Sequence, residues 1–256
     1  MHLLCLFLLT VQCALPTGVQ SSTDLSRLFD DALSNSRQGN FTEALLNWNH
    51  IIDAFPDNPS AWSNRGNTKL ALGDSTGAIH DQDESIKLDP NQRDAYLNRG
   101  VAEEKSKLWN QAADDYQLIL NKNPRDSEAL YNFANVQVVL GEWAKAQDFY
   151  NKAARERPNF AIARSSQALV AYQLGQFDVA EVELRKLIKS YPLLADARAA
   201  LVALLWHLNL SGEAQSHWAA VIGLDIRYQQ LEWLLNIRRW PEQPALDLME
   251  FIQSVD

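Results

Sequence analysis

The feature that most constrains this chain is an alanine that recurs every 34 residues. Six alanines keep this spacing, and five prolines keep it too, each twelve residues after one of the first five alanines: Ala44, Ala78, Ala112, Ala146, Ala180 and Ala214, with Pro56, Pro90, Pro124, Pro158 and Pro192. Such a period is typical of helical hairpins that stack into a solenoid, because one hairpin cannot bury its apolar face alone. The sequence therefore predicts an all-α fold.

Each recurring position has a physical reason in a helical hairpin. The alanine suits the place where two helices cross closely, since a larger side chain would push them apart. Glycines such as Gly39 and Gly73 suit the turn between the helices, where a left-handed backbone is needed. The proline ends the second helix. Large side chains four residues after the alanine share its helical face and fill the space between hairpins: Trp48, Tyr116, Tyr150, Leu184 and Trp218.

The spacing predicts six repeats followed by a C-terminal segment. The repeats are 25–58, 59–92, 93–126, 127–160, 161–194 and 195–228. The sixth is degenerate, because Ile226 stands where the proline is expected. Residues 229–256 are predicted to form a C-terminal cap, in which Pro244 suits the first turn of a helix whose apolar side covers the exposed end of the stack.

These residues resemble tetratricopeptide repeats over about 25–228. The resemblance implies a right-handed superhelical solenoid of about six hairpins that binds proteins and is not an enzyme. More narrowly, residues 61–66, 96–100, 195–201 and 237–241 are similar to a group of such proteins in cyanobacteria and chloroplasts. The resemblance then implies a scaffold that assists assembly or maintenance of a photosynthetic membrane complex. A cytoplasmic adaptor with an unrelated protein partner is the alternative.

Residues 1–22 form an apolar leader without Asp, Glu, Lys or Arg. The run from Leu3 to Val11 has the length of a signal-peptide core and is too short to span a bilayer. We expect a signal peptide and export to the thylakoid lumen or periplasm, although the basic residues usual at its start are missing. A retained membrane anchor and a cytoplasmic protein with an apolar extension are the alternatives. Cys5 and Cys13 both lie in this leader, so the mature chain would have no cysteine.

The resemblance implies that the first helix of each hairpin lines a concave inner face. Its sixth position is Asn64, Asn98 and Asn132 in three consecutive repeats. An amide both donates and accepts, so this row suits the backbone of an extended peptide, or else a partner helix. The alternative is that the asparagines bridge neighbouring helices structurally. The candidate binding site is completed by four further residues: Asn67, Asn135, Lys105 and Tyr131.

From the fifth repeat onward the predicted inner face turns apolar or small. Its residues include Ile162, Ser166, Leu169, Ala200 and Ala203. Two occupants fit such a surface: a hydrophobic segment of a partner, or the C-terminal cap of this chain. The sequence leaves both open.

Charge and motifs narrow the class of ligand. The net charge of -9 disfavours nucleic acid and an anionic membrane surface, which leaves a protein partner and peripheral association with a membrane complex through that partner. Arg65 and Arg99 are expected to pair with acids of a neighbouring hairpin. His80 and Glu84 could share a helical face, but their setting favours a solvated surface over a metal site. We expect no catalytic residue, cofactor, metal or small-molecule substrate, because no motif for them is present.

Overall fold

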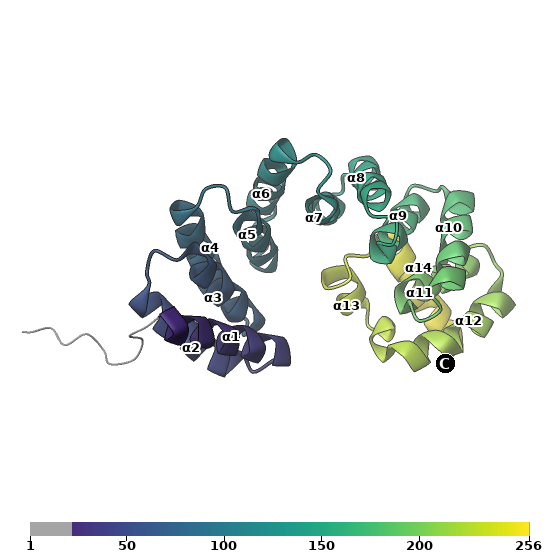
Figure 1. The fold of residues 1–256 in the computed structure, drawn as a ribbon. Helices are drawn as coiled ribbons and strands as arrows, with labels where there is room; N and C mark the ends of the chain where they lie inside the picture. The colour runs from purple at the N-terminus through teal and green to yellow at the C-terminus, as the bar shows by residue number, and fades with distance from the viewer. Residues whose placement is uncertain (1–21, 256) are drawn as a thin grey trace, which may run out of the picture.

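The computed structural model describes residues 22–255, which form an arch of helices (Figure 1). Six hairpins follow one another, and a tail follows the sixth. The hairpins are α1 (Ser22–Gln38) with α2 (Phe41–Ala54), α3 (Pro59–Ala71) with α4 (Ser75–Leu88), α5 (Arg93–Lys105) with α6 (Trp109–Lys122), α7 (Ser127–Val139) with α8 (Trp143–Glu156), α9 (Ala161–Gln173) with α10 (Phe177–Ser190), and α11 (Ala195–His207) with α12 (Ser211–Leu224). The tail holds η1 (Ile226–Gln229), α13 (Leu231–Asn236) and α14 (Glu242–Val255). The predicted all-α solenoid of about six hairpins is confirmed.

The period in the sequence is also the period of packing. The first helices of the second to sixth hairpins begin 34 residues apart, from Pro59 to Ala195. All six recurring alanines are at most 1% exposed, which confirms that they lie where helices cross. Four of the predicted large residues are buried as completely, and the fifth, Trp218, is partly buried and packs edge-on against Phe251 of α14 at 5.8 Å between ring centroids.

The turns between paired helices use a left-handed residue, as predicted. Gly39, Gly73, Gly141 and Gly175 have φ between 73° and 88°. In the third and sixth hairpins the equivalent residues are Lys107 and Asn209, each with φ of 60°. The turn geometry is therefore kept where the glycine is absent, at the expense of placing a side chain in a region that L-residues disfavour.

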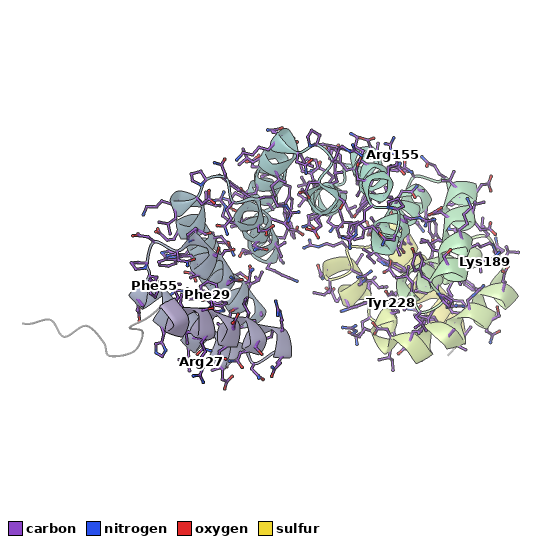
Figure 2. All side chains as sticks on the ribbon, in the orientation of Figure 1. Arg27, Phe29, Phe55, Arg155, Lys189 and Tyr228 are labelled. Atoms are coloured by element: carbon purple, nitrogen blue, oxygen red, sulfur yellow. The ribbon has the colours of Figure 1, made fainter. Side chains whose placement is uncertain are left out.

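The first helices lie on the inner side of the arch and the second helices on the outer side. Figure 1 shows α5, α7, α9 and α11 nearer to the hollow of the arch than their partners α6, α8, α10 and α12. Successive first helices also touch each other, as α3 does α5 and α9 does α11. Arg155 of α8 and Lys189 of α10, both exposed, mark the outer side (Figure 2).

The C-terminal tail occupies the inner face of the last two hairpins. Helix α14 packs against α11 and α9, which are both first helices. Phe251 is fully buried and contacts Trp206 of α11 with ring centroids 5.9 Å apart. Pro244 lies in the first turn of α14, as predicted. Of the two occupants that the sequence leaves open for this apolar inner face, the C-terminal cap is the one found there, because α11 is apolar on nearly all sides and its inner side needs a cover.

Residues 1–21 of the predicted leader, including Cys5 and Cys13, lie outside the residues that the structure describes. Among residues 22–255, no helix combines the length and the apolar character needed to cross a bilayer.

Candidate functional site on the inner face of α3, α5 and α7

The asparagine row lies on three successive first helices, and its members differ in what they contact. Asn64, Asn98 and Asn132 are all half-buried. Asn98 donates from Nδ2 to Oγ of Ser63 across to α3, at a long distance of 3.5 Å. Within residues 22–255 the side-chain amides of Asn64 and Asn132 make no hydrogen bond. Two of the three amides are therefore available to a ligand.

The two further asparagines of the predicted site serve the fold. Oδ1 of Asn67 accepts from Nε2 of Gln82 at 3.1 Å, and the same nitrogen donates to the Ser63 carbonyl at 2.9 Å. Oδ1 of Asn135 accepts from the Tyr150 hydroxyl at 2.6 Å. Because Tyr150 is only 1% exposed, its hydroxyl needs that partner. Asn67 and Asn135 are thus the bridging residues that the sequence left as an alternative for the whole row.

Tyr131 and Lys105 also differ from each other in setting. Tyr131 packs between Tyr150 and Phe160, with ring centroids 5.7 and 5.0 Å away, and burial raises its pKa. Lys105 is exposed at the C-terminal end of α5 and has no ion pair among the described residues. Of this pair, only Lys105 offers a charge to a ligand.

An ionic chain follows the edge of the site from the start of α5 to the start of α7. Arg93 pairs with Asp94 at 2.7 Å, with Asp126 at 2.7 Å and with Glu128 at 2.9 Å. Burial alone would raise the pKa of Asp126, but the hydrogen bonds from Arg93 hold that pKa below its ordinary value. Arg93 thereby joins the third and fourth hairpins.

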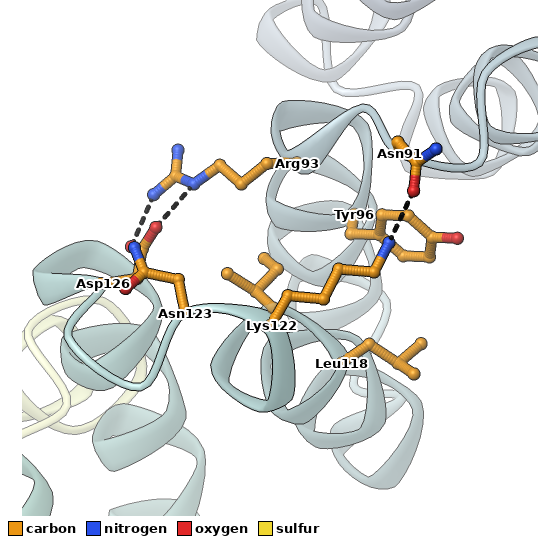
Figure 3. A pocket seen from close by; sticks show the side chains of 8 residues that line it. Asn91, Arg93, Tyr96, Leu118, Lys122, Asn123 and Asp126 are labelled. Carbon is orange, nitrogen blue, oxygen red and sulfur yellow. Dashed lines mark hydrogen bonds and ion pairs between the residues drawn. The ribbon is translucent and has the colours of Figure 1, made fainter.

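A cavity of about 300 Å³ lies at the end of the third hairpin and is separate from the asparagine row (Figure 3). Tyr96, Leu118 and Ile119 form its apolar lining. Arg93 and Asp126 lie at one side, and Lys122 bonds Asn91 at the other, at 3.3 Å. Tyr96 and Asn98 are two residues apart on α5, so they point to nearly opposite sides of the helix. The cavity therefore does not open onto the inner face.

The repeated arginines pair chiefly within their own hairpins, which corrects the prediction of partners in a neighbouring hairpin. Arg65 of α3 makes two hydrogen bonds to Asp81 of α4, at 2.8 and 2.9 Å. Arg99 of α5 makes the same pair of bonds to Asp115 of α6, at 2.8 and 2.6 Å. Nη1 of Arg99 donates to Asp83 of the preceding hairpin at 2.6 Å, so the prediction holds for that contact alone. The second helix of the same hairpin offers each arginine a carboxylate that accepts two hydrogen bonds, whereas the preceding hairpin offers Arg65 the amide of Asn49.

The sequence did not reveal two carboxylates that receive the tail. Asp196 of α11, 2% exposed, accepts from Arg238 at 2.6 and 3.0 Å and from Nε1 of Trp240 at 3.1 Å. Glu104 of α5 accepts from Nη2 of Arg239 at 2.9 Å. The only signal was a pair of arginines, the sole basic residues of segment 229–256, and a pattern along one segment does not identify partners 42 and 135 residues away.

The arrangement has the features of a surface that holds a polypeptide. Among residues 22–255, no group of three or more His, Cys, Asp and Glu side chains is placed to bind a metal ion. His80 lies beside Asp81, its Nδ1 3.4 Å from Oδ1. The exposed Lys105, and the amides of Asn64 and Asn132 that make no hydrogen bond among the described residues, are features of a binding surface.

Comparison with known proteins agrees with this geometry. Models of a family described as tetratricopeptide repeat match residues 29–92, 63–120, 128–159 and 166–193. Tetratricopeptide repeat protein 36 of Danio rerio is 38% identical over 56 residues, which are 22% of this chain and 30% of that protein. This chain thus matches less than a third of the length of that curated relative.

Solved structures show the same fold at low sequence identity. A tetratricopeptide repeat protein from Parabacteroides merdae is 17% identical, with 90% of this chain and 98% of that one covered, at a TM-score of 0.66. YrrB, described as a repeat protein with an unusual peptide-binding site, is 17% identical over 70% of this chain and 92% of its own, at 0.55. These likenesses establish the architecture.

Proposed function

Because this chain belongs to the tetratricopeptide-repeat family, we propose that it is a non-enzymatic scaffold that holds an extended segment of a partner protein on the inner face of α3, α5 and α7. The family membership makes it a protein-binding scaffold. The proposal adds to this the place of binding within the arch and the form of the ligand.

The observation that carries the proposal is the contrast between the two halves of the inner face. In the fifth and sixth hairpins that face is covered by α14. In the second and fourth, the amides of Asn64 and Asn132 are half-buried and unpaired among the described residues. A half-buried amide without a partner is costly unless water or a ligand satisfies it, and a peptide backbone offers both a donor and an acceptor. Hydrogen bonds to the peptide backbone do not depend on the partner's side chains, so this surface would accept partners of different sequence.

The proposal is tested by capturing the partner from the native host with the purified full chain. Asn64→Ala with Asn132→Ala removes two peptide contacts of about 0.5–1.5 kcal/mol each and should weaken capture roughly tenfold. Asn110→Ala with Asn151→Ala changes the same residue type on α6 and α8, where both side chains are exposed, and serves as the matched control. Equal capture by both double variants would place the ligand elsewhere.

The finer proposal is that the protein is exported and assists assembly or maintenance of a membrane complex, in particular a photosynthetic one. The apolar leader over residues 1–22 and the resemblance of residues 61–66, 96–100, 195–201 and 237–241 to proteins of cyanobacteria and chloroplasts support it. Sequencing the N-terminus of the protein isolated from its host tests the export. A chain that begins intact at Met1 in the soluble cytoplasm would favour the alternative, a cytoplasmic adaptor with an unrelated partner.

A further inference from the structure

The tail reaches across the arch and places one side chain in a socket on the third hairpin. Helix α13 lies on the inner side of the arch (Figure 1), where Leu234 is fully buried in the core of the last two hairpins. Just beyond it, Nη2 of Arg239 donates to Oε2 of Glu104 at 2.9 Å. The centre of the guanidinium lies 4.6 Å from the ring centroid of Trp109. Two segments 135 residues apart in the sequence are joined by this single side chain.

The socket consists of Glu104, Trp109 and Tyr116, and contacts within the third hairpin hold it in place. Oε1 of Glu104 accepts from the Tyr116 hydroxyl at 2.6 Å, which leaves Oε2 for the arginine. Tyr116 can approach because Gly100 has no side chain: a Cβ there would lie 2.6 Å from Cε1 of the tyrosine ring. Glu104 is 8% exposed, and burial raises its pKa, so the carboxylate needs a cation to remain charged. A buried carboxylate beside a flat indole matches a guanidinium in both charge and shape.

The backbone of Arg239 is in a disfavoured conformation, and the two neighbouring residues anchor the tail independently of its side chain. Its φ is 57°, in the left-handed region that a residue with a side chain disfavours. Its neighbours Arg238 and Trp240 anchor the tail separately, through Asp196. The Arg239 side chain can therefore leave Glu104 while the backbone on both sides stays in place.

The socket adjoins the candidate binding face. Asn98 and Glu104 both lie on α5, six residues or about 9 Å apart along the helix axis. Lys105, the exposed residue of the predicted site, directly follows Glu104. A peptide lying along the asparagine row would therefore pass close to this buried carboxylate.

We propose that Glu104, Trp109 and Tyr116 form a guanidinium-binding site, which Arg239 occupies in the free protein and an arginine of the partner segment takes on binding. The inference rests on the proposed function and names the partner's chemistry: an extended segment that carries an arginine. The net charge of -9 favours such a segment. Arg239 acts as an intramolecular competitor, so only a segment with additional contacts along the inner face displaces it.

The test uses the full chain and a small probe, N-acetyl-arginine methylamide, with the Trp109 indole N–H resonance as the readout. In Arg239→Ala the socket is empty, so the probe should bind at least tenfold more tightly than to the wild type. Adding Glu104→Gln should weaken binding at least tenfold, whereas adding Glu142→Gln, an exposed control, should not. The lysine analogue should bind more weakly, because an ammonium lacks the planar fork. Equal binding by wild type and Arg239→Ala, or no effect of Glu104→Gln, would overturn the proposal.

A second readout covers the case in which Arg239→Ala fails to fold. In the wild type, saturating probe should shift the Arg239 Nε–H resonance as the side chain leaves Glu104. A probe that shifts Trp109 without moving Arg239 binds elsewhere and contradicts the proposal.

The experiments distinguish a failure of the guanidinium-binding site from a failure of the proposed scaffold function. Asn64→Ala with Asn132→Ala should leave probe binding unchanged, because the probe spans only the socket. If partner capture depends on those asparagines and not on Glu104, the scaffold function stands and the arginine socket is rejected. If the probe binds as expected while the asparagine variant captures the partner normally, the socket stands and the asparagine face is rejected.

Discussion

Arg238 and Asp196 form the ionic contact that fixes the tail to the sixth hairpin. Nε and Nη2 of the arginine both donate to Oδ1 of the aspartate, at 3.0 and 2.6 Å. The same carboxylate accepts from the hydroxyls of Tyr228 at 3.0 Å and Ser165 at 2.6 Å. Figure 2 places Tyr228 within the C-terminal half of the arch, where it is buried. One aspartate thus joins α9, α11 and the tail.

Replacing Asp196 with Asn should therefore be costly. The variant leaves Arg238 largely buried without its counter-charge, and breaking such a pair costs about 3–5 kcal/mol of unfolding free energy. Urea unfolding at pH 7 measures it. Asp225→Asn breaks the more exposed pair with Arg227 and should cost clearly less. A similar cost for both variants would mean that the buried cluster does not hold the tail.

The stability of the protein should depend on pH through Glu103. Burial, and then the charge of Asp115, raise the pKa of this glutamate from 4.5 to about 7. The folded protein therefore binds the proton more tightly than the unfolded chain, so the stabilisation is present below pH 4.5 and is lost as the pH rises through about 7. Glu103→Gln should remove this loss. Between pH 5 and pH 8 the free energy of unfolding of the variant should rise by about 1–3 kcal/mol relative to that of the wild type.

Urea unfolding of wild type and Glu103→Gln at the two pH values checks this. Glu142→Gln, on an exposed turn, should keep the pH dependence of the wild type. If Glu103→Gln keeps this pH dependence as well, ionisation of Glu103 does not destabilise the folded protein.

The turn of the third hairpin should be open to improvement. Lys107 has φ of 60° where the first, second, fourth and fifth hairpins have glycine. Lys107→Gly relieves that conformation and should raise the unfolding free energy by up to about 1 kcal/mol. Gly73→Ala introduces the same strain at a φ of 88° and should lower it by about 1 kcal/mol or more. Thermal unfolding of the two variants should show shifts of opposite sign; a decrease in both would contradict this reading of the turn.

Two asparagines three residues apart on α7 should respond differently to the same change. Asn135→Ala leaves the buried Tyr150 hydroxyl without its partner and should cost about 1–3 kcal/mol. Asn132→Ala removes a side chain with no hydrogen bond among the described residues and should change stability by no more than about 0.5 kcal/mol. Urea unfolding separates them. Equal losses would show that Asn132 too is structural.

The fold was predictable because its determinants are local and repeated. Ala44 and its five equivalents, the turn glycines and the prolines each act within a single hairpin, so a period along the chain reports them directly. The path of the tail was not predictable to the same degree. Whether α14 covers the end of the stack or the inner side of α11 depends on packing between segments that the period does not relate.

The asparagine row was predictable as a set of positions, and its hydrogen bonds were not. Asn64, Asn98 and Asn132 lie on successive first helices, as the period of the sequence predicts. Whether an asparagine is free or bonded depends on its neighbour: Tyr150 lies opposite Asn135 and Gln82 opposite Asn67. Glu104 has no repeat equivalent in its role, because its partner comes from the tail, and so no pattern in the sequence singled it out.

The most direct test of the scaffold is site-specific cross-linking from its two faces. A photoreactive amino acid is placed at Asn132 on the inner face, or at Lys186, which is exposed on α10. Each full-length variant is then irradiated in extracts of the native host. The account predicts that position 132 forms a covalent adduct with a defined partner and that position 186 does not. An adduct with the same partner from position 186 and none from position 132 would contradict binding on the inner face.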